Sequence, residues 1–334
     1  MRITLLMGCI ALAGCGGADS DNESPPTPAP TKTGVFLDSP VTGLNYRTAS
    51  IPAGVTNAKG EFNYREGETV SFYIGELILP SIKAGAQITP ADLGGGLSTA
   101  TTVNILQLLQ SLDQDGNPAN GIGILDSAKD AFVGTGLDIA SPTFDASASA
   151  ILNSIGKTLV SEAAANAHFS STLKAQLKGS WLFSEGAGKR NVLTFFDDTH
   201  YIIVHEHSDD GDQLAGSAEY GTYTYDLQAN KLMLEVIRES DNSGGLCDKY
   251  GAATLDIQAT DTSLSLEIPG FGTAVFDKVV RTTNPIVGAW LYIEYPSTIS
   301  TDDRSDNYNV LTVLPNNEYV IVHSRDGFSD TQVK

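Results

Sequence analysis

The sequence has few cysteines and few basic residues, and each shortage argues against particular classes of protein. Three cysteines in 334 residues are too few for the disulfide framework of a small secreted domain. The chain has 20 lysines and arginines against 40 acidic residues, which gives a formal net charge of −20. A surface this negative repels phosphate backbones and argues against nucleic acid as a partner, whereas divalent cations are its natural counter-ions.

Long apolar runs are also lacking near the N-terminus. The stretch from Ile3 to Leu12 is too short to span a bilayer as a helix, and with Arg2 before it is typical of a signal peptide. The residues Leu12-Ala13-Gly14-Cys15 then resemble the lipobox of bacterial lipoproteins. This resemblance implies that residues 1–14 are removed and that the mature protein begins at a triacylated Cys15. The alternative is an ordinary secretory signal with a chance cysteine.

Residues 15–33 contain small, acidic and proline residues and nothing that could build a core. Because Pro-rich chain is semi-extended, this segment is expected to be a tether that lifts the folded part off the membrane. Gly16, rather than Asp, after the cysteine resembles the outer-membrane sorting type of lipoprotein. The resemblance implies a cell-envelope protein in the outer membrane, held by lipid on Cys15. Once that thiol is acylated, Cys247 has no disulfide partner within the chain.

Residues 34–82 show the alternation and turn residues of short strands. The pattern G-x-F-x-D-S-P-V-x-G-L begins at Gly34, and G-x-F-x-Y-x-x-G-x-x-V-x-F begins at Gly60. Together they resemble the prealbumin-like β-sandwich modules of bacterial surface proteins and the N-terminal segment of adhesin-type lipoproteins from marine proteobacteria. The resemblance implies a β-sandwich-like module that serves as a spacer or a binding platform.

Residues 83–177 are expected to be mainly helical. Apolar residues recur at helical spacing over 101–112, which indicates a largely buried helix. A second helical stretch is expected over 145–177, where Asp145 can cap the start. Its two apolar stripes are Ile151, Ile155 and Leu159, then Phe169, Leu173 and Leu177. Core packing accounts for both stripes.

From Gly179 onward the pattern changes to strands joined by short turns. Short connections force neighbouring strands to be antiparallel, and eight such strands suit a meander closed into a small barrel over 178–283. Gly179-Ser180-Trp181 resembles the G-x-W start of lipocalin-like barrels. The chain as a whole is therefore predicted to be mostly β with a helical segment, in the α+β class. The candidate strands lie near 181–184, 192–196, 200–207, 217–225, 231–238, 253–258, 263–268 and 273–281.

Residues 284–334 repeat the start of this barrel, as a duplicated unit would. We expect two matching hairpins, Val192 to His205 and Val310 to His323, with Trp181 and Trp290 in equivalent places. The apolar face at Val320 and Val322 must be covered, or the fragment will be loosely ordered. The expected turns are Asp197-Asp198 and Pro315-Asn316-Asn317. The repeated pairs are Asn191–Thr194 with Asn309–Thr312, Tyr201–His205 with Tyr319–His323, and Gly179–Trp181 with Gly288–Trp290.

A candidate calcium site follows the first expected helix. Asp113, Asp115 and Asn117 place oxygen ligands at alternate positions, with Gly116 to turn the chain, as in the first half of an EF-hand loop. The late Glu of a complete EF-hand loop is missing, because Ile124 stands there. We expect the oxygens of the three ligands to face one another. The alternative is a helix-terminating turn that merely uses Asp, Gly and Asn.

Other reactive residues give weaker patterns. His205 and His207 lie two apart on an expected strand, as a zinc pair could, but the repeat has Arg325 at the second position. The motifs of hydrolases, zinc proteases and nucleotide-binding proteins are absent from the sequence. Cys247 stands beside Asp248 without an obvious activating base. The sequence therefore predicts a protein without catalysis.

These observations favour a membrane-anchored extracytoplasmic lipoprotein with a non-catalytic binding, adhesive or structural role and a protein or cell-surface partner. One alternative is a lipocalin-like carrier, which needs an apolar barrel interior that is left partly empty. A third reading is a hydrolase without a familiar motif, which needs a cleft where titratable groups converge.

Overall fold

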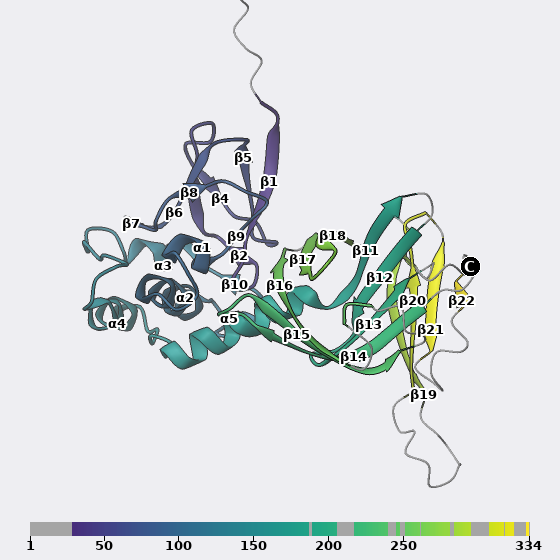
Figure 1. The fold of residues 1–334 in the computed structure, drawn as a ribbon. Helices are drawn as coiled ribbons and strands as arrows, with labels where there is room; N and C mark the ends of the chain where they lie inside the picture. Colours follow the sequence, from purple (N-terminus) through teal and green to yellow (C-terminus); the bar gives the residue numbers. More distant parts are fainter. Residues whose placement is uncertain are drawn as a thin grey trace, which may run out of the picture.

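The computed structural model of the chain describes residues 29–186, 189–205, 217–239, 245–247, 251–260, 262–280, 284–294, 307–316, 318–323 and 332–333. The signal segment and Cys15 lie outside these residues, as does His207. In chain order the structure contains a β-module, a helical segment, a β-barrel and a further β-sheet (Figure 1). The predicted architecture, mostly β with a helical segment, is confirmed.

The β-module is built from two small sheets around an aromatic core. Alternate residues of each strand point inward, so that Phe36 and Phe62 meet Phe72 edge to face at ring-centroid distances of 4.7 and 5.3 Å. One sheet has the order β5 (Glu61–Arg65), β1 (Thr31–Phe36), β9 (Gln87–Ile88). The other has the order β4 (Gly54–Val55), β3 (Asn45–Arg47), β6 (Thr69–Ile74), β7 (Leu77–Ile78), and β8 (Ile82–Lys83) also pairs with β6.

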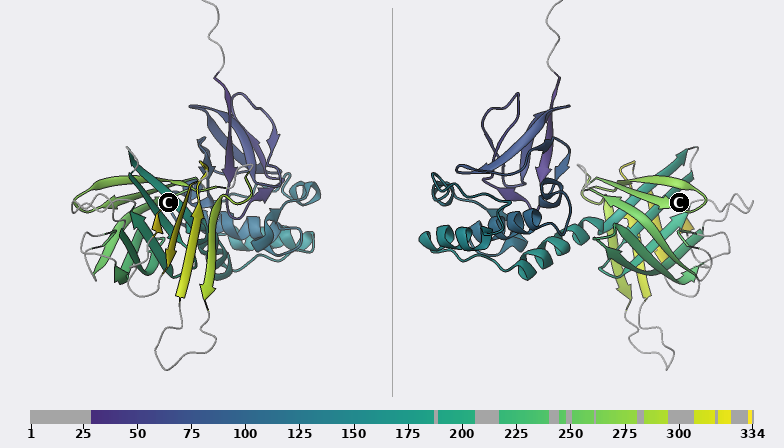
Figure 2. Two further views of the ribbon diagram at one scale, coloured as in Figure 1. Left: turned by 90° about the vertical axis from the view of Figure 1, so that its right-hand side faces the viewer. Right: turned by 60° about the vertical axis from the view of Figure 1, so that its left-hand side comes forward.

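The helical segment lies against this module and shares its core (Figures 1 and 2). A further strand, β10 (Ile122–Gly123), pairs in parallel with β2 (Val41–Thr42) of the module and so joins the two parts. The central helix α2 is buried at every position from Thr102 to Leu112. The helices are α1 (Pro90–Gly94), α2 (Ala100–Leu112), η1 (Pro118–Asn120), α3 (Asp126–Asp130), α4 (Phe144–Ser154) and α5 (Glu162–Leu177).

The expected helical stretch over 145–177 is two helices instead of one. Helix α4 ends at Ser154, and Gly156 then adopts a left-handed φ of 71°, which a helix cannot continue. Ser161 begins α5, where its side chain accepts a hydrogen bond from the backbone N–H of Ala164. Asp145 does not cap α4, because it lies inside the first helical turn.

Eight antiparallel strands then close into a barrel, which confirms the predicted meander. Closure comes from β11, which pairs with β12 on one side and β18 on the other. Helix α5 leads directly into β11, and Leu177 joins the barrel core. The strands are β11 (Gly179–Gly186), β12 (Lys189–Phe195), β13 (His200–His205), β14 (Ser217–Asp226), β15 (Lys231–Glu239), β16 (Ala252–Ala259), β17 (Ser263–Ile268) and β18 (Gly272–Lys278).

Large side chains fill the described part of the barrel interior. Trp181, Phe195, Tyr201 and Phe276 are all fully buried there and belong to one apolar cluster. The Tyr201 ring packs closely against the backbone at Gly221. A Cβ at this position would lie 2.8 Å from the ring carbon Cε1, so a larger residue would not fit. An interior packed in this way behaves as a core rather than as a ligand cavity.

The last sheet repeats the first three barrel strands in the same register. The indole of Trp181 donates to the carbonyl of Leu177, and that of Trp290 donates to the carbonyl of Ile286, both at 2.8 Å and both four residues back. The two predicted hairpins are therefore confirmed, although Asn317 of the second turn lies outside the described residues. The strands are β19 (Gly288–Glu294), β20 (Asn307–Val313), β21 (Tyr319–His323) and β22 (Gln332–Val333); the equivalent pairs are Trp181↔Leu193 with Trp290↔Leu311, and Asn191↔His205 with Asn309↔His323.

The repeated sheet lies against the outer face of the barrel beside β11 (Figure 1). The Ser180 hydroxyl lies 2.6 Å from that of Thr194 and 3.1 Å from that of Thr312, and all three residues are buried. Register places Val320 and Val322 on the same face as Thr312. The side chains of those two valines lie outside the part of the chain that the structure describes.

The two tryptophans give a matched test of the duplication. Trp181 is 0% exposed and Trp290 is 41% exposed, although their hydrogen bonds are alike. We expect Trp181→Phe to lower the free energy of unfolding by about 1–3 kcal/mol, because a buried carbonyl loses its donor in a packed core. Trp290→Phe should cost under about 1 kcal/mol, because water can replace the lost donor. Urea unfolding followed by circular dichroism measures both costs, and equal losses would contradict the difference in burial.

Candidate functional site at the junction of the β-module and the helices

The turn between β1 and β2 brings a buried carboxyl to the helices. Both carboxyl oxygens of Asp38 lie near the Gln110 amide Nε2 of α2, at 3.3 and 3.1 Å, and that amide also donates to the carbonyl of Ala165 in α5. Burial raises the pKa of Asp38 well above its usual value, and the Gln110 hydrogen bond only partly opposes this. The uncharged form of Asp38 is therefore the one that this junction favours.

A serine and a histidine meet beside Asp38. The Ser39 hydroxyl lies 3.1 Å from Nε2 of His168, and Ser39 adopts a left-handed φ of 63°. The same Nε2 lies 3.3 Å from the Asp38 carbonyl oxygen and 3.9 Å from its carboxyl oxygen Oδ1. In a Ser-His-Asp triad the carboxylate must bind the other ring nitrogen, so that the serine proton can pass to Nε2. Burial lowers the pKa of His168, and the group acts as a neutral link between two segments.

The predicted cation loop lies at the C-terminal end of α2, in the same region. Oδ1 of Asp113 accepts a hydrogen bond from the backbone N–H of Gly123 at 2.8 Å, while Oδ2 is buried with no hydrogen-bond partner. Asp115 accepts from the side-chain amide of Asn120 at 3.0 Å and from the backbone N–H of Asn117 at 2.9 Å. These hydrogen bonds from Asn120 and Asn117 are the largest causes that lower the pKa of Asp115, and the neighbouring Asp113 side chain adds to them.

The structure thus brings two of the three predicted ligands together. The carboxyls of Asp113 and Asp115 interact, whereas Asn117 contributes its backbone N–H and exposes its side chain. No group of three or more His, Cys, Asp or Glu side chains is placed to share a metal ion among the described residues. A calcium site here would need amide, carbonyl and water oxygens as well.

A second buried polar cluster lies inside the barrel. Glu219 accepts hydrogen bonds from the Tyr201 hydroxyl at 2.6 Å and from the backbone N–H groups of Leu246 and Cys247 at 3.4 and 3.2 Å. The Cys247 thiol is buried, 3.8 Å from the Tyr201 hydroxyl. Burial and the charge of Glu219 raise the pKa of Tyr201, so the hydroxyl keeps its proton. The cluster holds Leu246 and Cys247 against strands β13 and β14.

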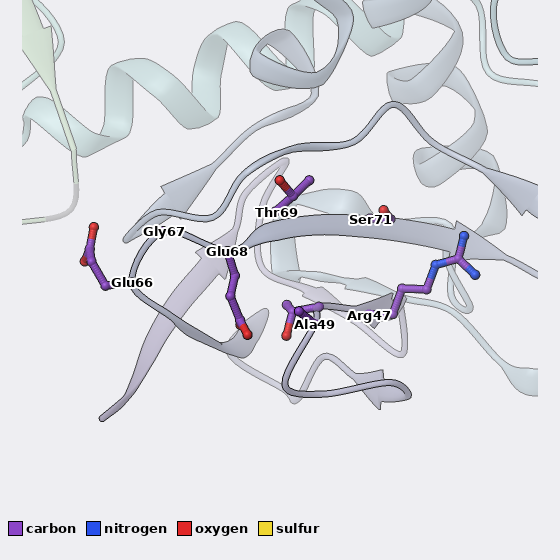
Figure 3. Close-up of a pocket in the computed structure, with 8 residues that line it drawn as sticks. Arg47, Ala49, Glu66, Gly67, Glu68, Thr69 and Ser71 are labelled. Atoms are coloured by element: carbon purple, nitrogen blue, oxygen red, sulfur yellow. The ribbon is translucent and has the colours of Figure 1, made fainter. Parts of the chain in front are cut away.

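The remaining candidates do not form a site. His205 bonds through Nδ1 to the side chain of Asn191, and its predicted zinc partner His207 lies outside the described residues. The β-module has a recess of about 720 Å³. The charged side chains of Arg47 and Glu66 lie at opposite ends of it and do not point toward each other (Figure 3). The recess is lined by Arg47, Thr48, Ala49, Glu66, Gly67, Glu68, Thr69 and Ser71.

The chain matches no protein-family model, no curated protein and no solved structure. Within the described ranges, no helix has both the length and the apolar character needed to cross a membrane. Sequence reasoning found the two aspartates of the loop but missed Asp38, Gln110 and His168, although an aspartate directly after an apolar strand is a signal that could have directed attention to Asp38.

The buried carboxyl of Asp38 makes stability depend on pH. Its folded-state pKa lies above the unfolded value, so the folded chain binds the proton more tightly and loses stability as pH rises through that interval. We expect Asp38→Asn to raise Tm relative to the wild type at pH 8 more than at pH 4, because the amide carries no charge to bury. Thermal melts with EDTA present measure this. Asp130→Asn, at an exposed position on α3, is the control, and an equal effect at both pH values would contradict the proposed burial cost.

Proposed function

We propose that this chain is a membrane-anchored extracytoplasmic lipoprotein with a non-catalytic binding, adhesive or structural role. Lipid on Cys15 would hold it to the outer membrane, and the residues between Cys15 and β1 would be the tether, which is shorter than the expected 15–33 because residues 31–33 pair with β5. In support of this arrangement, strand β1 begins at the end of the β-module that lies away from the barrel, with its first residues exposed (Figure 1). The folded part would then present the module, the helices and the barrel to a protein or cell-surface partner.

One observation carries the proposal: the buried reactive groups are held by internal hydrogen bonds. Ser39 and His168 bond to each other, and the carboxyl of Asp38 is bound by Gln110. Glu219 is bound by Tyr201 and two backbone amides. Asp38, Ser39 and Glu219 are also buried, so they link segments of the chain, whereas a nucleophile or base must be accessible to a substrate.

The two other candidate functions have less support. An apolar carrier needs an empty interior, but aromatic side chains fill the described part of the barrel. A hydrolase needs a base aligned with its nucleophile, and the Asp38 carboxyl approaches the wrong nitrogen of His168 for that role. A binding or structural role requires neither feature.

The anchor is tested by substituting the proposed lipidation site. We expect Cys15→Ser to release the protein from membranes, because the thiol is the acyl acceptor and several acyl chains are needed for stable binding. Cys9→Ser is the matched control, since it changes the other cysteine of the signal segment and should leave the protein in the membrane fraction. The measurement is fractionation of cells after a high-salt wash. Retention of the Cys15→Ser variant in the pellet would show that lipid on this residue is not the anchor.

The absence of catalysis is tested on the Ser39–His168 pair. A fluorophosphonate probe labels serine hydroxyls that a histidine activates. We expect the wild-type chain to remain unlabelled, because within the described ranges the carboxylate beside His168 lies near Nε2 and none bonds to Nδ1. Ser39→Ala is the control for the site of any labelling. Labelling of the wild type that disappears in Ser39→Ala would favour the hydrolase over a binding protein.

A further inference from the structure

Asp113 has an unusual combination of burial and missing partners. The residue is 2% exposed, and its Oδ2 atom meets no hydrogen-bond donor within the described structure. Burying a carboxylate oxygen without a hydrogen-bond partner costs on the order of several kcal/mol. Such an atom is normally matched by a proton, an ordered water molecule or a cation.

A second carboxyl lies beside this atom. Asp115 is exposed, and its two carboxyl oxygens accept hydrogen bonds from the backbone N–H of Asn117 and the side-chain amide of Asn120. Its carboxyl lies beside the Asp113 side chain, so two acidic groups meet at this loop. A cation satisfies both carboxylates at once.

The basic side chains near the loop do not bind Oδ2 of Asp113 in the described structure. The ammonium of Lys157 donates to the backbone carbonyls of Asp113 and Gln114, not to the carboxylate oxygen. His168 directs Nε2 to the Ser39 hydroxyl and the Asp38 carbonyl instead, at 3.1 and 3.3 Å. Neither side chain therefore supplies a partner to Oδ2 in the described structure.

The oxygens available suit a hard cation of flexible coordination. Asp113 and Asp115 supply carboxylates, and the side-chain amides of Asn117 and Asn120 lie on the same exposed loop and can offer oxygens. Calcium accepts six to eight oxygen ligands, including water, in variable geometry, whereas magnesium requires a nearly regular octahedron. A loop with two carboxylates and open access to water fits the first of these ions better.

We propose that the loop of residues 113–123 binds Ca²⁺ through Asp113 and Asp115, and that the ion strengthens the junction between the helices and the β-module. The loop is in the right place for this effect. Asp113 holds Gly123 through Oδ1, and β10, which contains Gly123, pairs with β2 of the module. The site does not depend on the lipid anchor. With two carboxylates and no bidentate Glu, its Kd should be on the order of 10⁻⁴–10⁻³ M, as in extracellular calcium modules.

The test is calcium titration of the purified full-length chain from an EDTA-treated start, followed by calorimetry and thermal melting. We expect saturable binding of one ion and a rise in Tm of about 3 °C or more at tenfold the Kd, because a ligand that binds only the folded state stabilises it. Magnesium at the same concentration should give a smaller rise. Absence of both heat and a Tm shift up to about 10 mM calcium would overturn the proposal.

Variants separate a built site from general attraction to an acidic protein. Asp115→Asn keeps a side-chain oxygen for the Asn117 N–H and changes an exposed residue, so it should fold and weaken calcium binding at least about tenfold. Asp113→Asn should abolish the Tm shift, and Asp130→Asn should leave it unchanged. If Asp115→Asn binds calcium as tightly as Asp130→Asn does, the ion is held by the overall charge of −20 and the proposed site is wrong.

Discussion

Helix α2 is buried on nearly all sides, so each of its polar side chains needs a hydrogen-bond partner from another segment. Asn104 donates to the carbonyl of Ile139, Gln107 to that of Val160, and Gln110 to Asp38 and Ala165. Ser111 accepts from the backbone N–H of Val160. One face of the helix meets the core of the β-module, and Leu106 meets α5. The N-terminal half of the molecule is thus assembled around one helix that specifies its neighbours through polar bonds.

The junction at the end of this helix combines groups with opposite electrostatic needs. Asp38 is part of the β1–β2 turn, where burial favours its uncharged form. Asp115 lies in the exposed loop, where hydrogen bonds favour its charged form. Asp113 lies between these environments, buried but adjacent to the exposed carboxylate. The difference follows from solvent access and donors, because all three are the same residue type.

The C-terminal half depends on a different constraint, the matching of two related sheets. The closed barrel leaves its outer face beside β12 and β13 apolar, with Val192, Ile202 and Val204 buried there. The repeated sheet pairs Thr312 with Val320 and Val310 with Val322, in the register that Thr194 and Val192 have with Ile202 and Val204. The hydroxyls of Ser180, Thr194 and Thr312 form the polar contact between the two surfaces. Equivalent faces of the duplicated unit therefore meet each other.

The strands, their pairing and the repeat could be predicted from the sequence. Alternation with a period of two fixes which side chains share a face of the sheet. Short turns between consecutive strands favour antiparallel pairing. The sequence also indicated the burial of α2, whose apolar residues recur at helical spacing. The break between α4 and α5 is also local, because Gly156 is a stop signal and Ser161 a start signal that override the apolar period. Tertiary structure alone decided the meeting of Asp38 with His168, which lies 130 positions along the chain. Contacts of this separation arise only when packed elements bring distant residues together, and no local pattern encodes them.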